Sequence, residues 1–220
     1  MHCLPDTVAV QGTDCKATPN AYAEAMSSSL AIIATATGLV ALAEIGDKTM
    51  LLALLLAARF RKPSSVIAGI LVATLTKHAL AAWAGATLAD WLAGPWFQLA
   101  VALGFIAMAA WTLVPDKMDD MPAIASGAQA FLATTVAFFI VEIGDKTQIA
   151  TIALGARFHG VLAVTIGTTL GMMIANVPAV LLGDKLLARV PLKAVRTAAA
   201  AVLALLGVVM LAALWPQFVR

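Results

Sequence analysis

The chain has 220 residues, of which 62% are hydrophobic and 12% are charged, and its formal net charge is +2. A soluble domain carries roughly a quarter charged residues, so this composition excludes an ordinary soluble protein and predicts an integral membrane protein. Because the position of each charge matters more than the sum in such a protein, the net charge identifies no partner. We expect the lipid bilayer as its surroundings and no nucleic acid.

Residues 1–27 are polar and mixed, and they lack the basic segment and apolar run of a signal peptide. We predict a disordered N-terminal extension there. The rest of the chain holds six segments that are apolar over the roughly 20 residues a helix needs to cross a bilayer. These predicted spans are residues 28–58, 64–89, 96–114, 127–156, 160–183 and 195–215. The predicted fold class is all-α, with six transmembrane helices.

The distribution of Lys and Arg predicts the orientation of the spans, because cytoplasmic loops carry an excess of both residues. Most of the cations that flank the spans fall in the links after the first, third and fifth spans. Those links should face the cytoplasm, which puts both termini on the periplasmic side. Short links and the absence of organelle-targeting features favour a multi-pass protein of the bacterial inner membrane.

The sequence EIGDKT occurs twice, at residues 44–49 and 142–147. The same offset aligns Arg59 with Arg157 without a gap, which indicates a duplication. The predicted organisation is a first three-helix repeat at residues 28–115, an acidic linker at 116–126 and a second three-helix repeat at 127–220. Because three is odd, the second repeat would be inverted relative to the first, as in many secondary transporters that bind substrate between their repeats.

A duplicated helical segment can also persist for packing alone, since Gly46 and Gly144 would allow helices to approach closely. Packing does not require Glu, Asp and Lys together at bilayer depth. A charge there costs a few kcal/mol even on the lenient insertion scale, and such residues normally face the bundle interior or a water-filled cavity. We therefore interpret the motifs as functional.

The spacing of the motif predicts how its side chains lie. On a continuous helix Glu44 and Asp47 share a face, and Lys48 can pair with either carboxylate. Gly46 weakens the helix by about 1 kcal/mol relative to alanine and could allow a kink. If the two motifs meet, four carboxylates converge beside hydroxyl and amide oxygens. The predicted metal ligands are Glu44, Asp47, Thr49, Glu142, Asp145, Thr147 and Gln148.

Four motif carboxylates and the ammonium groups of Lys48 and Lys146 sum to a charge of −2, which one dehydrated divalent cation would neutralise. Oxygen ligands suit Mg²⁺, Ca²⁺ and Mn²⁺. Carboxylates that crowd together in a low dielectric repel one another, so some should bind protons when no metal is present. Metal and protons would then compete for the same oxygens. This predicts a secondary transporter that exchanges a divalent cation for protons and carries no cofactor.

Three further polar residues inside the predicted spans are candidates for a role at the site. His78 is a candidate ligand or proton relay, and Asn176, at the matching position of the second repeat, is a candidate ligand. The alternative for both is a polar contact between helices. We assign both, together with Lys48 and Lys146, to proton coupling or to the surroundings of the ligands. Lys77 either extends to the membrane surface or pairs with a motif carboxylate.

Two Glu-Ile-Gly-Asp-Lys-Thr motifs in a chain of six predicted spans resemble those of the GDT family, whose members are manganese and calcium transporters of the Golgi, the thylakoid and bacteria. The resemblance covers the chain from about residue 28 onward. It implies cation/proton antiport that exports Mn²⁺, and in some branches Ca²⁺, from the cytosol. The acidic ligands it implies are Glu44, Asp47, Glu142 and Asp145.

One position departs from the family pattern. The family often continues the motif with Gln, which is Gln148 in the second copy but Met50 in the first. Either this position is not a ligand in the first half, or the site has one oxygen fewer. A thioether sulfur ligand would favour Mn²⁺ over Ca²⁺.

The sequence leaves other functions open. An exporter of a small cationic solute such as an amino acid could use an acidic cavity, although one ammonium group needs less negative charge than the repeated motif supplies. A channel could use the same ligands without alternating access. A membrane hydrolase is disfavoured because the sequence shows no nucleophile–base pair. The oligomeric state is also open, with a homodimer as one option.

Overall fold

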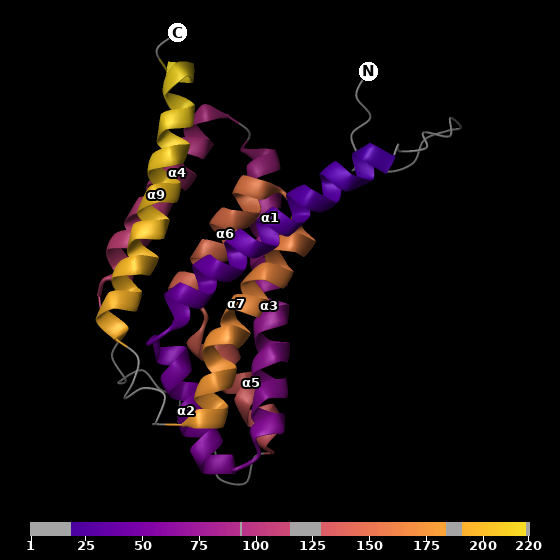
Figure 1. Cartoon of the computed structure of the whole chain (residues 1–220), viewed down its shortest axis with the longest axis vertical. Coiled ribbons are helices and arrows are strands. Elements are labelled where there is room, and N and C mark those ends of the chain that lie inside the picture. Colours follow the sequence, from indigo (N-terminus) through magenta and orange to yellow (C-terminus); the bar gives the residue numbers. More distant parts are fainter. Residues whose placement is uncertain (1–18, 93, 115–128, 184–190, 219–220) are drawn as a thin grey trace.

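The structure is a computed structural model that describes residues 19–92, 94–114, 129–183 and 191–218 (Figure 1). Every regular element in these residues is an α-helix. The helices are α1 (Pro19–Glu44), α2 (Lys48–Phe60), α3 (Pro63–Trp91), α4 (Pro95–Thr112), α5 (Ala130–Val141), α6 (Lys146–Phe158), α7 (Val161–Leu182) and α9 (Leu192–Phe218). The predicted all-α class is thus confirmed for the described part of the chain.

Both copies of the motif interrupt a helix. The axes of α1 and α2 differ by 72° across the first copy, and the second copy separates the end of α5 at Val141 from the start of α6 at Lys146. Gly46 has a φ of 83° and Gly144 a φ of 74°, a left-handed conformation that glycine adopts without a steric penalty. The kink that Gly46 was expected to allow is therefore present, and the motif does not continue as one helix because the glycine turns the chain out of it.

Four helices are long and apolar enough to cross a membrane: α3, α4, α7 and the Lys193–Pro216 part of α9. A fifth crossing results if the bent pair of α1 and α2 counts as one span. The segment predicted as the fourth span, residues 127–156, is divided between α5, an apolar helix of 12 residues, and α6. The chain is therefore a multi-pass membrane protein.

The helices that flank the two breaks form one bundle. α1 packs along α7, while α3 packs along α5 and crosses α6. The crossing of α3 and α6 is close because Gly85 and Gly155 face the partner backbone. A Cβ atom at either position would overlap a carbonyl oxygen, that of Ile152 or that of Ala82. Small residues at such crossings let membrane helices approach closely, and here they bring the end of α6 against the end of α3.

α4 and α9 pack against each other along one side of the bundle (Figure 1). The beginning of α1 and the end of α9 lie toward one end of the molecule, and the link between α2 and α3 lies at the opposite end (Figure 1). α1 begins at Pro19, inside the segment predicted as a disordered extension. Residues 1–18 of that extension and the predicted linker at 116–126 lie outside the described residues.

Candidate functional site

The two breaks place the motif residues at the ends of four helices. Glu44 is the last residue of α1, and Asp47 precedes the first residue of α2. In the second copy Glu142 follows the last residue of α5, and Asp145 precedes the first residue of α6. Neither aspartate uses its carboxylate to cap its own helix. Both therefore remain at helix N-termini, where the helix dipole favours a negative charge.

Three of the four motif carboxylates come together. Glu44, Asp47 and Asp145 each offer an oxygen, and these oxygens all lie within 4.8 Å of one another. The three residues are 0%, 3% and 2% exposed, respectively. Glu44 and Asp47 are thus neighbours, as predicted, but through the turn at Gly46 and not through a shared helix face. Such crowding of carboxylates in a low dielectric is unfavourable unless cations or protons compensate it.

Each motif lysine pairs with the aspartate of the other motif. Lys48 Nζ lies 3.4 Å from Asp145 Oδ1, and Lys146 Nζ lies 3.1 Å from Asp47 Oδ1. The prediction that Lys48 pairs within its own motif is wrong, because the break turns the two motifs toward each other. These reciprocal ion pairs join the two halves of the chain at the carboxylates.

Both motif threonines donate to one glutamate. The hydroxyl of Thr49 donates to Glu44 Oε2, and that of Thr147 donates to Glu44 Oε1. Both threonines are buried. In this arrangement they orient the Glu44 carboxylate, and a direct contact of either hydroxyl with a metal stays a prediction.

Glu142, the fourth motif carboxylate, has a different partner. Lys77 Nζ lies 3.2 Å from Glu142 Oε2, and both side chains are 3% exposed. The same ammonium group lies 5.9 Å from the centre of the Phe139 ring. Of the two alternatives for Lys77, pairing with a motif carboxylate is therefore confirmed. Glu142 is not part of the cluster that Glu44, Asp47 and Asp145 form, and its ligand role stays a prediction.

The side chain that follows the motif threonine, Met50 in the first copy and Gln148 in the second, does not reach the clustered carboxylates. Gln148 Oε1 accepts a hydrogen bond of 2.7 Å from the backbone N–H of Gly144. Met50 is 1% exposed and packs with Leu54 and Ala179 in an apolar cluster. Gln148 thus stabilises the turn of its own motif, and Met50 fills a hydrophobic space. The structure brings neither side chain to the carboxylate cluster, and a ligand role for Gln148 stays a prediction.

His78 and Asn176 are both buried. The Asn176 amide nitrogen donates to Met172 O, one turn earlier in α7, over 3.0 Å. Asn176 Oδ1 and His78 Nδ1 have no hydrogen-bond partner. Within the described residues, no hydrogen bond or ion pair joins either side chain to a motif carboxylate. Their predicted role in the surroundings of the site stays a prediction.

The structure adds one contact that the sequence did not indicate. Arg196, near the start of α9, donates from Nη2 to the backbone oxygen of Gly46 over 2.9 Å. The helix break frees that carbonyl from a regular helical hydrogen bond. In the sequence Arg196 is one of several cations around the start of the sixth predicted span, and nothing in its neighbours signals a contact with a distant backbone.

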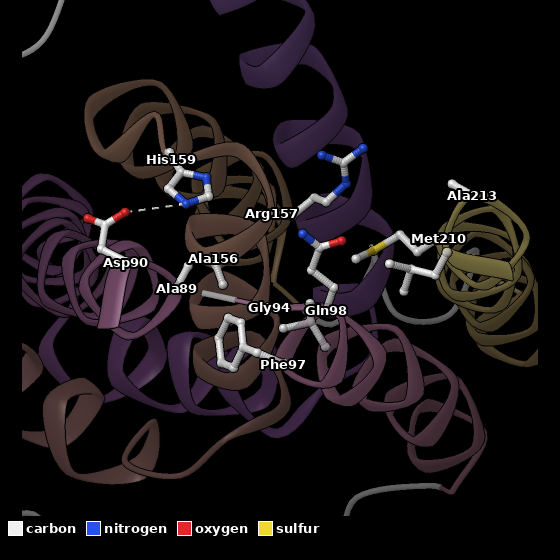
Figure 2. A pocket seen from close by; sticks show the side chains of 12 residues that line it. Ala89, Asp90, Gly94, Phe97, Gln98, Ala156, Arg157, His159, Met210 and Ala213 are labelled. Atoms are coloured by element: carbon white, nitrogen blue, oxygen red, sulfur yellow. Dashed lines mark ion pairs between the residues drawn. The ribbon is translucent and has the colours of Figure 1, made fainter. Parts of the chain in front are cut away.

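A second polar region, which contains none of the motif residues, lies where α3, α4, α6 and α9 meet. A cavity of about 530 Å³ is lined by residues at the ends of α3, α6 and α9 and at the start of α4. Figure 2 shows His159 and Asp90 paired at one side of it, with Nε2 and Oδ1 3.6 Å apart. Arg157 and Gln98 also line it. The cavity includes none of the motif residues, since α6 begins in the second motif and reaches the cavity with its opposite end.

The family model described as divalent cation/proton antiporter GDT1 matches residues 32–120 and, separately, residues 130–217. A curated relative from Vibrio cholerae serotype O1, named "Putative manganese exporter", is 48% identical over 179 residues. That alignment covers 81% of this chain and 89% of the relative. No solved structure matches. Each of the two family matches contains one motif and one helix break.

Proposed function

We infer the transport reaction from one premise: this chain belongs to the divalent cation/proton antiporter GDT1 family and exports divalent cations. We propose that its substrate is Mn²⁺, with Ca²⁺ as the second candidate, and that protons move in the opposite direction. The observation that carries the proposal is the cluster of Glu44, Asp47 and Asp145. Its three buried carboxylates come from both motifs, and their oxygens lie within 4.8 Å of one another.

We propose that the three clustered carboxylates bind the metal directly. A divalent cation between the two aspartates would compete with Lys48 and Lys146 for the same oxygens, because each lysine lies within 3.4 Å of one aspartate oxygen. Carboxylate oxygens are ligands that both Mn²⁺ and Ca²⁺ accept. Thr49 and Thr147 hold the Glu44 carboxylate in place for this contact. Protons that neutralise the carboxylates after the metal leaves would complete the exchange.

We propose that the fold consists of two inverted three-helix repeats with six spans. In this arrangement α1 and α2 form one broken span, and α5 and α6 form another. The separate family matches to the two halves and the matching breaks at Gly46 and Gly144 support the duplication. Discontinuous helices that meet at a midplane site are the usual construction of such transporters.

We propose that the protein lies in the bacterial inner membrane with both termini in the periplasm. The end of the molecule that holds the α2–α3 link carries Arg59, Arg61 and Lys62. An excess of Lys and Arg marks the cytoplasmic side of a membrane protein. The beginning of α1 and the end of α9 lie toward the opposite end.

The test uses purified protein in liposomes that contain a metal-sensitive dye, with an imposed pH gradient. We expect Mn²⁺ flux that follows the pH gradient. We expect Glu44→Gln to slow it by about a hundredfold or more, because a buried charged ligand is lost. Asp90→Asn, which changes an exposed carboxylate in the other cavity, should transport like the wild type. Parallel measurements with Ca²⁺ rank the two metals.

Two other outcomes would contradict the proposal. Mn²⁺ flux that does not depend on the pH gradient would indicate a channel. The absence of any metal flux from the wild type would exclude the cation substrate, and a cationic amino acid would then be tested in the same liposomes.

A further inference from the structure

We propose that one side of α7 lines a narrow water-filled route, through which protons reach the carboxylate cluster from the end of the bundle where α6 ends and α7 begins. Thr165, Thr169 and Asn176 line this route, and we call them the α7 polar row. The inference rests on the proposed function, since it takes proton exchange at the cluster as given and assigns the path that the protons follow.

Two hydroxyl groups of the row are not used by their own helix. A threonine in a helix commonly donates its hydroxyl hydrogen to the carbonyl one turn earlier, and Thr168 of α7 donates in this way to Val164 O. Most threonines of the other described helices do the same. The hydroxyls of Thr165 and Thr169 have no hydrogen-bond partner, although both side chains are only 5% exposed. They are therefore available to bind another molecule.

The α7 polar row lies on the side of α7 that faces away from α1. An α-helix has 3.6 residues per turn, which places Thr165, Thr169 and Asn176 within about 40° of one another around the helix axis. Gly167 and Gly171 occupy the opposite side, where a Cβ atom would overlap the backbone of α1. Because the row is buried, it faces the interior of the bundle, where α3 also packs against α7 (Figure 1).

The row extends from one end of the bundle to the depth of the motif. With a rise of 1.5 Å per residue, Thr165, Thr169 and Asn176 lie about 6, 12 and 22 Å along the axis from the first residue of α7. α6 begins at Lys146 and runs toward the same end over 13 residues, so its motif end lies about 18 Å from there. The innermost residue of the row is therefore level with the motif.

α3 adds two atoms of the same kind at this depth. Thr74 Oγ1 and His78 Nδ1 are buried without a hydrogen-bond partner, and their spacing of four residues places them on one side of α3. Buried polar atoms are costly unless they are hydrogen-bonded, and ordered water is what usually satisfies them when no protein group does. The α7 polar row contains no carboxylate, which a divalent cation would need. It therefore suits water and protons and not the metal.

The first test measures whether water reaches the row. In the full-length protein with Cys3 and Cys15 replaced by serine, Thr165→Cys and Thr169→Cys are treated with Ag⁺, and the thiols that remain are labelled with a maleimide after denaturation. We expect both cysteines to react with Ag⁺ about tenfold faster than Thr168→Cys, because a thiol reacts as the thiolate, which needs water. Thr168 is the matched control, since it is buried in the same turn of α7 and its hydroxyl is used within the helix. Equal rates for Thr169→Cys and Thr168→Cys would overturn the water-filled route.

The second test measures proton-coupled transport. Thr165→Val/Thr169→Val removes both hydroxyls with little change of shape, and we expect Mn²⁺ flux under a pH gradient at saturating Mn²⁺ to fall about tenfold. The Kd for Mn²⁺, measured from the paramagnetic resonance signal of free Mn²⁺, should stay within about twofold of the wild type, because the row lies outside the carboxylate cluster. Thr165→Ser/Thr169→Ser keeps both hydroxyls and should transport like the wild type, as should Thr168→Val.

Two transport results would overturn the role of the row. One is wild-type flux in Thr165→Val/Thr169→Val. The other is a loss of both flux and Mn²⁺ affinity in the valine and the serine double variants alike, which would show that these residues act through packing. Failure of the proposed function would look different. A wild-type protein without Mn²⁺ flux would remove the transport role, whereas the Ag⁺ comparison would still decide whether water reaches the row.

Discussion

Glu44 and Glu142 occupy the same position in two identical motifs, yet their surroundings differ. Two hydroxyl groups donate to Glu44, which lies among the clustered carboxylates. A lysine from another helix pairs with Glu142. The chemistry of each carboxylate is therefore set by residues that reach it from elsewhere in the fold. Substitutions at matching positions of the two motifs should consequently have unequal effects.

The hydroxyl contacts to Glu44 lead to a prediction about affinity. Thr147→Val and Thr49→Val each remove one hydrogen bond to a charged group, which contributes about 1.5–3 kcal/mol. We expect each variant to raise the KM for Mn²⁺ about tenfold in liposome transport, since about 1.4 kcal/mol corresponds to a factor of ten. Thr151→Val is the matched control, because its buried hydroxyl bonds only to Thr147 O within α6. An unchanged KM in the Thr49→Val/Thr147→Val double variant would contradict an orienting role.

At the scale of the elements, the helix breaks are what create the site. A continuous helix would keep the carbonyl of Gly46 in the helical hydrogen-bond ladder and direct the motif side chains around one helix. The turns instead place Asp47 and Asp145 at helix N-termini and aim each motif lysine at the opposite motif. The freed carbonyl of Gly46 accepts from Arg196. Because both turns depend on a positive φ, they depend on glycine.

Gly144 allows this dependence to be tested without steric interference. A Cβ atom at Gly144 would meet nothing within 4 Å, but its φ is 74°. Gly144→Ala should therefore destabilise the protein by about 1–2 kcal/mol through backbone strain alone. Thermal unfolding of the detergent-solubilised protein measures the change. Gly104→Ala is the control, because it lies inside helix α4 and also meets nothing within 4 Å. A loss of stability in the control equal to that of Gly144→Ala would contradict the argument.

At the scale of the whole molecule, α3 connects two ends with different character. Near its start lie the cations Arg59, Arg61 and Lys62, and near its end lies the cavity that contains Asp90 and His159. A helix of 29 residues is about 44 Å long, which exceeds the hydrocarbon core of a bilayer. Lys62 and His159 should therefore lie on opposite sides of the membrane.

This orientation can be measured with single cysteines. In a variant whose native Cys3 and Cys15 are replaced by serine, we expect Lys62→Cys to react with a membrane-impermeant maleimide only from the cytoplasmic side. His159→Cys should react only from the periplasmic side. Labelling of intact cells and of inverted vesicles separates the two cases. Labelling of both cysteines from the same side would contradict the topology, and exchanged sides would reverse the orientation while preserving the fold.

The sequence by itself determined the membrane class, the duplicated motif and the family, because composition and a repeated string of charged residues at bilayer depth do not depend on how the chain folds. It also predicted that acids of both motifs meet, and three of them do. Only the tertiary structure decided which lysine pairs with which acid. The partners of Glu142, Asp145 and Gly46 are Lys77, Lys48 and Arg196, and each comes from a segment distant in sequence. Local spacing cannot reveal such pairs, because the turns at the two glycines redirect the side chains and the packing of α3, α6 and α9 then selects their neighbours.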